Sequence, residues 1–197
     1  MKKAYLVTAL ILASLNLRPS ITSIPPLLGT IQAELDISGS IASLLTSLPV
    51  LCMGIFAMLA VKLNRRWGTE KAILLALILI GFGTALRFFA VSTFTLLITS
   101  FLTGVGIAIA GPLLSGFIKQ YFPNRASTMV GLYSTAMVIG AVLSIWLSVP
   151  LQKAIHGSWN ASLSLWALLA VIAVPIWWRL ALKIPKMNRR KRKRTLT

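Results

Sequence analysis

Six apolar segments, each about 20 residues long, dominate this sequence of 197 residues. A helix of that length crosses the hydrocarbon core of a bilayer. Only 12% of the residues are charged and 57% are hydrophobic, which leaves too little charge to cover a soluble domain. We therefore predict an all-α integral membrane protein with one six-helix bundle over residues 1–182 and a basic tail at 183–197. The predicted transmembrane helices are residues 4–28, 41–61, 72–90, 94–118, 127–149 and 163–182.

The Lys and Arg residues are divided unevenly between the two ends of these predicted helices. The amino terminus, the second-to-third loop, the fourth-to-fifth loop and the tail hold nearly all of them. The opposite side holds only Arg87 and Lys153, together with the acids Glu34 and Asp36. Loops rich in Lys and Arg stay on the cytoplasmic side of a membrane. Both termini are therefore expected in the cytoplasm, and the even number of helices agrees with this.

The first 15 residues, MKKAYLVTALILASL, could also form a secretory signal peptide, because a basic start precedes a short apolar region. No A-x-A-like cleavage site follows, and the apolar run continues to Leu28. We therefore expect an uncleaved first transmembrane helix. The four Trp residues of the last segment and the loop before it are expected at the membrane–water interfaces. They are Trp159, Trp166, Trp177 and Trp178.

Arg18 lies near the middle of the first predicted helix, where an arginine costs about 2.5–3.5 kcal/mol to insert and normally faces the bundle interior or a water-filled cavity. Pro19 removes one backbone hydrogen bond beside it. A planar guanidinium can hold an anion through two N–H groups, and none of the six segments contains a carboxylate that could pair with it. We predict that Arg18 binds a small anion, with Asn16 and Thr22 assisting. The alternative is a structural arginine whose donors are satisfied by backbone carbonyls.

Enzymatic chemistry is not expected from this sequence. It contains one His, one Cys and three acids, and these form no nucleophile–base pair or metal-binding group. We therefore predict no enzyme activity and no cofactor or metal. The basic tail is expected to contact acidic lipid, and because it lacks interleaved aromatic residues we expect no binding of nucleic acid.

Two further stretches carry helix-shaping or loop residues. Gly111 and Pro112 predict a kink in the fourth segment, and the small residues around them permit close helix contact, beginning at Gly104. The loop VKLNRRWGTEK, residues 61–71, resembles the G-x-x-x-D-R-x-G-R-K signature of the major facilitator superfamily, with Arg66 and Gly68 on the pattern. Arg65 replaces the Asp of that signature, which puts the charge interaction of that Asp in doubt.

Four stretches together resemble the cyanate and nitroimidazole branch of the major facilitator superfamily. They are LNLRPSITSIPPLL (15–28), LLTSLPVLCMG (44–54), GVGIAIAGPLLSGFIKQYFP (104–123) and GLYSTAMVIGA (131–141). The resemblance implies a transporter of cyanate or a similarly small solute in the inner (plasma) membrane of a bacterium. Such transporters have twelve helices in two halves, with the substrate between them near the midplane. We therefore expect the amino-terminal half of a transporter, with a second six-helix half as its partner.

Two other hypotheses remain open at this point. The chain could be a membrane protein that does not transport and whose basic tail docks acidic lipid or a partner protein. It could also be an inactive remnant of a truncated transporter. The first alternative predicts a phenotype when the tail is deleted but none when Arg18 is neutralised. The second predicts rapid degradation.

Overall fold

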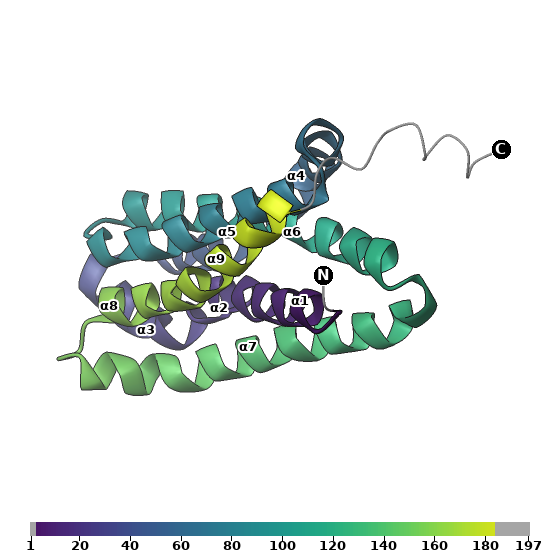
Figure 1. Ribbon diagram of the computed structural model, residues 1–197. Coiled ribbons are helices and arrows are strands. Elements are labelled where there is room, and N and C mark those ends of the chain that lie inside the picture. Colours follow the sequence, from purple (N-terminus) through teal and green to yellow (C-terminus); the bar gives the residue numbers. More distant parts are fainter. Residues whose placement is uncertain (1–2, 184–197) are drawn as a thin grey trace.

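The computed structural model describes residues 3–183, in which helices form one bundle and no strand occurs (Figure 1). Six helical stretches are long and apolar enough to cross a membrane, which confirms the predicted number. Most of them extend beyond the predicted ends, because the helical hydrogen bonds continue into the polar residues that flank each apolar core. The stretches are Lys3–Leu35, Gly39–Trp67, Thr69–Phe89, Thr93–Tyr121, Pro123–Ala154 and Trp159–Leu182.

The first stretch forms one candidate membrane span but is not one continuous helix. Pro19 has no N–H to donate and favours the first turn of a new helix, and α1 accordingly ends one residue before Arg18 while α2 begins at Pro19. Pro25 begins a short 3-10 helix in the same way. The pieces are α1 (Lys3–Leu17), α2 (Pro19–Thr22), η1 (Pro25–Leu27) and α3 (Leu28–Leu35).

The remaining stretches are long helices with short 3-10 or α-helical segments at their ends. The second, fourth and fifth stretches contain the longest helices, and the sixth consists of a short helix followed by a longer one. These elements are α4 (Gly39–Trp67), α5 (Thr69–Ala85), η2 (Leu86–Phe89), α6 (Thr93–Tyr121), η3 (Pro123–Arg125), α7 (Ala126–Ala154), α8 (Trp159–Leu165) and α9 (Ala167–Lys183).

Helix α6 lies at the centre of the bundle and is the most buried of the six stretches. Both α4 and α5 pack against it. A Cβ built on Gly104 would lie 2.7 Å from the Cα of Pro49 in α4, and one built on Gly106 would lie 2.6 Å from Cγ1 of Ile80 in α5. The close contact predicted at Gly104 is therefore confirmed. Only glycine allows the backbones to approach so closely.

Helix α9 packs against α1 and α5 through its aromatic and small residues. The Trp177 indole is fully buried and donates a hydrogen bond of 2.9 Å to the Ala9 carbonyl, and the Tyr5 hydroxyl donates one of 2.8 Å to the Ile176 carbonyl. The interfacial position expected for Trp177 stays a prediction, although its ring faces the bundle interior instead of lipid. Its indole N–H has a partner in α1, so the ring can be buried inside the bundle.

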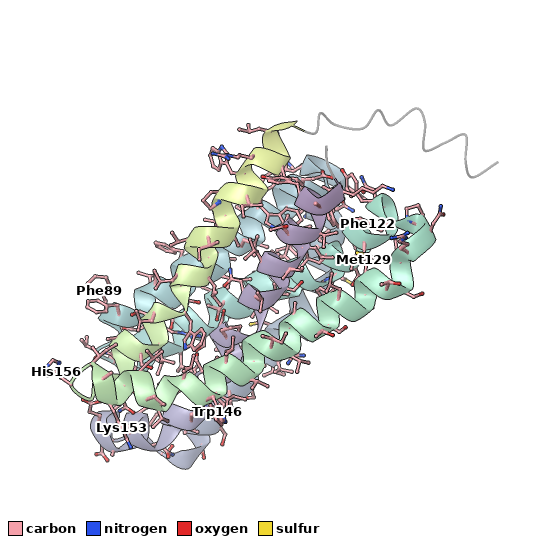
Figure 2. All side chains as sticks on the ribbon, turned by 60° about the horizontal axis from the view of Figure 1, so that its bottom comes forward. Phe89, Phe122, Met129, Trp146, Lys153 and His156 are labelled. Atoms are coloured by element: carbon pink, nitrogen blue, oxygen red, sulfur yellow. The ribbon has the colours of Figure 1, made fainter. Side chains whose placement is uncertain are left out.

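The two ends of the bundle carry different residues. In Figure 1, one end of the bundle holds the start of α1, the end of α9 and the α4–α5 and α6–α7 connections. Helices α3 and α8 lie at the other end. Figure 2 shows Phe122 and Met129 at the first end, and Lys153 and His156 at the second. The exposed basic residues of the α4–α5 and α6–α7 connections therefore share one end of the bundle, which is the arrangement that the sequence predicted for one side of the membrane.

Candidate functional site

Arg18 lies at the break between α1 and α2, close to the middle of the first 33-residue stretch. Its side chain is exposed on the surface of the bundle, although its neighbours Leu17 and Pro19 are buried. Among residues 3–183, no side chain forms a hydrogen bond or an ion pair with the Arg18 guanidinium. An exposed cation at this depth needs water, an anion or another protein surface around it.

The described acids lie far from this break along their helices. Glu34 is near the end of α3 and Asp36 directly follows that helix, while Glu70 is in the first turn of α5 at the other end of the bundle. Within the described range 3–183, no three His, Cys, Asp or Glu side chains gather into a group that could hold a metal ion. The chemistry available at Arg18 is therefore hydrogen bonding and charge.

Helix α7 holds the break in place at two adjacent turns. Pro19 cannot donate the helical hydrogen bond to the carbonyl of Leu15, and that carbonyl lies against Gly140 of α7. A Cβ built on Gly140 would lie only 2.6 Å from the Leu15 oxygen. One turn further along α7, the Ser144 hydroxyl is hydrogen-bonded to the Thr22 hydroxyl at 2.6 Å. Helix α7 therefore covers the carbonyl that Pro19 leaves without its helical hydrogen bond.

Thr22 and Asn16 flank Arg18 in different environments. The Thr22 hydroxyl lies 2.9 Å from the Arg18 carbonyl as well as near Ser144, so it stabilises the turn that carries the guanidinium. Asn16 is only 2% exposed, and its side-chain Nδ2 has no hydrogen-bond partner among the described residues. A buried amide N–H without a partner is unfavourable, so Asn16 can donate to a ligand or a water molecule that reaches it.

Tyr133 of α7 is a candidate site residue that sequence reasoning missed. It is partly buried and packs against the main hydrophobic core, on the helix that covers the break. Its phenol can donate a hydrogen bond, so it adds a further donor to the helix beside Arg18. Tyr133 was within one of the stretches that carried the family resemblance, but no local pattern linked it to Arg18, because the two residues are more than a hundred positions apart.

Several transmembrane glycines face open space instead of a neighbouring helix. A Cβ built on Gly54 of α4, on Gly111 or Gly116 of α6, or on Gly131 of α7 would meet no atom within 4 Å. Helices α4 and α7 are also the least buried of the six stretches. Helix α6 runs without a break through Gly111 and Pro112, and Pro112 is exposed. The kink predicted there stays a prediction.

Arg87 lies at the same end of the bundle as α8, with which its segment packs, so the side on which we counted it stays a prediction. Its side chain is fully buried in η2, at the end of the third stretch. Its Nη2 group donates a 3.4 Å hydrogen bond to the Thr103 hydroxyl, while Nε and Nη1 have no partner among the described residues. Helices α6 and α8 pack around η2 and cover the side chain.

We predict that the charge of Arg87 contributes little to the stability of the bundle. A buried cation without a carboxylate is costly, and an apolar residue of similar volume can replace such a group at no loss. Arg87→Met should therefore leave the melting temperature in detergent unchanged or higher, while Arg87→Ala, which leaves a cavity, should lower stability by about 2 kcal/mol. If both variants melt equally early, the charge itself is required.

The turn between α4 and α5 contains the loop-motif residues. Gly68 has a φ of 92°, a conformation that glycine adopts most easily, and it alone separates the two helices. The Arg66 guanidinium carbon lies 5.9 Å from the centre of the Trp67 ring. The Tyr121 hydroxyl donates a 2.6 Å hydrogen bond to Glu70, so the turn is joined to the end of α6 without the Asp of the family signature. Arg66 and Gly68 lie at the end of α4, away from Arg18.

The fold and the site together define a multi-pass membrane protein with an unpartnered arginine inside its first span. The chain belongs to the major facilitator superfamily, whose family model matches residues 6–196. This finding confirms the family resemblance and the expected fold class of one transporter half. It also confirms that the chain is related to transporters and not to enzymes.

Three curated relatives agree with this assignment. The uncharacterized transporter YycB of Bacillus subtilis (strain 168) is 38% identical over 94% of this chain. The cyanate transport protein CynX of Escherichia coli (strain K12) is 33% identical over 87%, and the 2-nitroimidazole transporter of the same organism is 33% identical over 88%. The matched region covers 44% of each relative, so the chain spans less than half the length of these proteins.

Proposed function

We propose that this chain forms the amino-terminal six-helix half of a secondary transporter for a small anion, with cyanate as the first candidate substrate. The observation that carries the proposal is the Arg18 guanidinium. It is exposed in the middle of a membrane span, and no described side chain pairs with it. A guanidinium in that setting binds a planar or linear anion through parallel N–H groups.

The residues around Arg18 support an anion in preference to a cation. Asn16 contributes amide N–H groups without a partner among the described residues, and Tyr133 is a phenol on α7, the helix that covers the break. All of these groups can donate hydrogen bonds, and no carboxylate lies at the break. In this proposal Arg18 holds the anion, Asn16 donates to it, and Thr22 assists by fixing the turn. Pro19, Gly111 and Pro112 shape the helices on either side.

A second six-helix half is the partner that this proposal requires. The open glycines and the low burial of α4 and α7 support a surface that another helical bundle covers. The length of the relatives supports it too, because the chain matches less than half of each. In family transporters the substrate lies between two halves near the midplane. The distribution of basic residues supports a bacterial inner-membrane location with both termini in the cytoplasm.

A 2-nitroimidazole is the second candidate substrate, because a relative named as a transporter of that compound matches this chain as well as the cyanate transport protein does. A nitro group presents two oxygens in the same plane, so a guanidinium can donate to both of them. Competition tests whether the two candidates bind at the same site. A nitroimidazole that inhibits cyanate uptake completely would indicate one shared site.

Uptake of labelled cyanate tests the proposal directly. The chain is expressed in a strain without cyanate transport, alone and together with a candidate second six-helix half. We expect saturable uptake from the pair and background uptake from the chain alone, because one half leaves the site open to lipid. If the assembled pair takes up neither cyanate nor 2-nitroimidazole, the proposed substrate class is wrong. If deleting the basic tail changes uptake while Arg18→Gln does not, the non-transporting hypothesis is favoured.

A further inference from the structure

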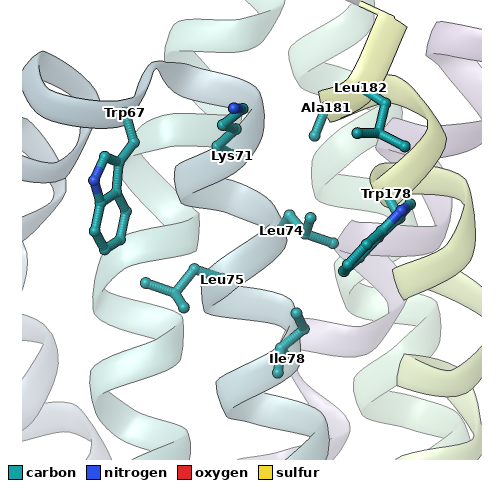
Figure 3. A pocket seen from close by; sticks show the side chains of 8 residues that line it. All are labelled: Trp67, Lys71, Leu74, Leu75, Ile78, Trp178, Ala181 and Leu182. Carbon is teal, nitrogen blue, oxygen red and sulfur yellow. The ribbon is translucent and has the colours of Figure 1, made fainter.

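A groove of about 420 Å³ lies between α5 and α9, at the same end of the bundle as the α4–α5 turn (Figure 3). Trp67 and Trp178 lie on opposite sides of it, as Figure 3 shows, and both indoles are exposed. Its floor is formed by apolar side chains of α5, among them Leu74, Leu75 and Ile78. Lys71 is the single charged residue among those that line the groove.

The groove is complementary to the two chemical parts of a lipid, the charged headgroup and the apolar acyl chain. Lys71 is exposed in the first turn of α5, and no carboxylate in the described part of the chain pairs with it. From Lys71 the apolar lining continues to Ile78, a distance of about 10 Å along the helix axis. Tryptophans are enriched where the headgroups meet the hydrocarbon. An ammonium group therefore lies at headgroup depth, and an apolar channel leads from it toward the membrane interior.

The place of the groove in the bundle keeps it open to the bilayer. It lies mainly on α5 and α9, and of its lining residues only Trp67, the last residue of α4, comes from another helix. The open glycines are on α4, α6 and α7, and α4 and α7 are the least buried helices. A second half that covers those helices would leave the groove facing lipid. The proposal therefore does not depend on transport, because any membrane around this bundle fills the groove.

We propose that this groove binds an anionic phospholipid, with its phosphate on Lys71 and one acyl chain along Leu74, Leu75 and Ile78 between the two indoles. Charge complementarity favours a phospholipid with an anionic headgroup. The groove offers a cation and no acid, and basic pockets between transmembrane helices bind anionic headgroups. A zwitterionic lipid brings its own cation close to Lys71, which removes most of the attraction.

Native mass spectrometry of the full chain in detergent tests the proposal, with phosphatidylglycerol and phosphatidylcholine as probes. Lys71→Gln is expected to weaken the first bound phosphatidylglycerol about fivefold, since one lysine near an anionic surface contributes about 1 kcal/mol. Lys71→Arg should restore binding, and phosphatidylcholine should be unaffected by either change. The matched control is Lys119→Gln, which removes an exposed lysine from the last turn of α6, outside the groove.

A second variant tests the apolar part of the groove. Leu75→Trp fills the channel without changing the charge, and it should reduce the first bound phosphatidylglycerol by at least the same factor. The proposal is overturned if Lys71→Gln binds like the parent protein. It is equally overturned if Lys119→Gln weakens binding as much as Lys71→Gln, because the attraction would then be diffuse. A loss of phosphatidylcholine that equals the loss of phosphatidylglycerol would also contradict an anion-selective site.

Discussion

Arg18→Gln in the assembled transporter is expected to lower kcat/KM for cyanate uptake about thirtyfold. The change removes charge-assisted hydrogen bonds to the anion, and such bonds contribute about 2 kcal/mol. The variant should still fold and reach the membrane, because the Arg18 side chain is exposed and forms no ion pair with a described residue. Initial rates in vesicles, corrected for the amount of transporter, give the measurement.

Two matched variants make this experiment specific to the guanidinium. Arg18→Lys keeps the charge but loses the planar guanidinium with its parallel N–H donors. Its uptake rate should therefore lie between those of the parent protein and Arg18→Gln. Arg125→Gln removes an exposed arginine at the α6–α7 connection and should leave uptake within about twofold of the parent protein. If Arg18→Gln transports as well as Arg125→Gln does, Arg18 has a structural role and the anion is held elsewhere.

Gly140→Leu is expected to be the most damaging substitution for the fold. The added Cβ would lie 2.6 Å from the Leu15 carbonyl oxygen, a backbone atom that cannot rotate away. Overpacking of this kind costs about 3 kcal/mol, and here it would separate α7 from the break that carries Arg18. We expect a lower melting temperature in detergent and, in fluorescence-detected size-exclusion chromatography, a smaller fraction of monodisperse protein.

The control for Gly140 lies on the same helix. Gly131 faces open space, and a Cβ there would meet no atom within 4 Å. Gly131→Leu should therefore leave the melting temperature of the isolated chain unchanged while it weakens association with a second half. If both glycine variants melt at the same reduced temperature, the loss comes from adding a large side chain anywhere on α7, and the close contact at Gly140 is not important for stability.

The number of membrane spans could be predicted from the sequence because each apolar run is long enough to cross a bilayer by itself. The break in the first span was also signalled locally, by Pro19. Its stabilisation could not be predicted, because the groups involved are Gly140 and Ser144, which come from a helix more than a hundred residues later. Local patterns do not report which surface of α7 meets α1.

The two glycines and the two arginines show the same limit of prediction from local sequence. Gly140 and Gly131 are identical in the sequence of one helix, yet one touches a backbone carbonyl and the other touches nothing. Arg18 lies in the middle of an apolar segment and is exposed, whereas Arg87 lies near the end of one and is buried. Hydrophobicity predicts that a segment enters the membrane. It does not predict which of its faces the other helices cover.

The central position of α6 has a consequence for the order in which the bundle assembles during synthesis. Helices α4 and α5 follow each other in the chain, but each packs mainly against α6 and only weakly against the other. The second and third spans therefore leave the ribosome before their common partner exists. They gain their main contacts only when residues 93–121 have emerged, so the nascent chain depends on the insertion machinery or on lipid to shield these surfaces until then.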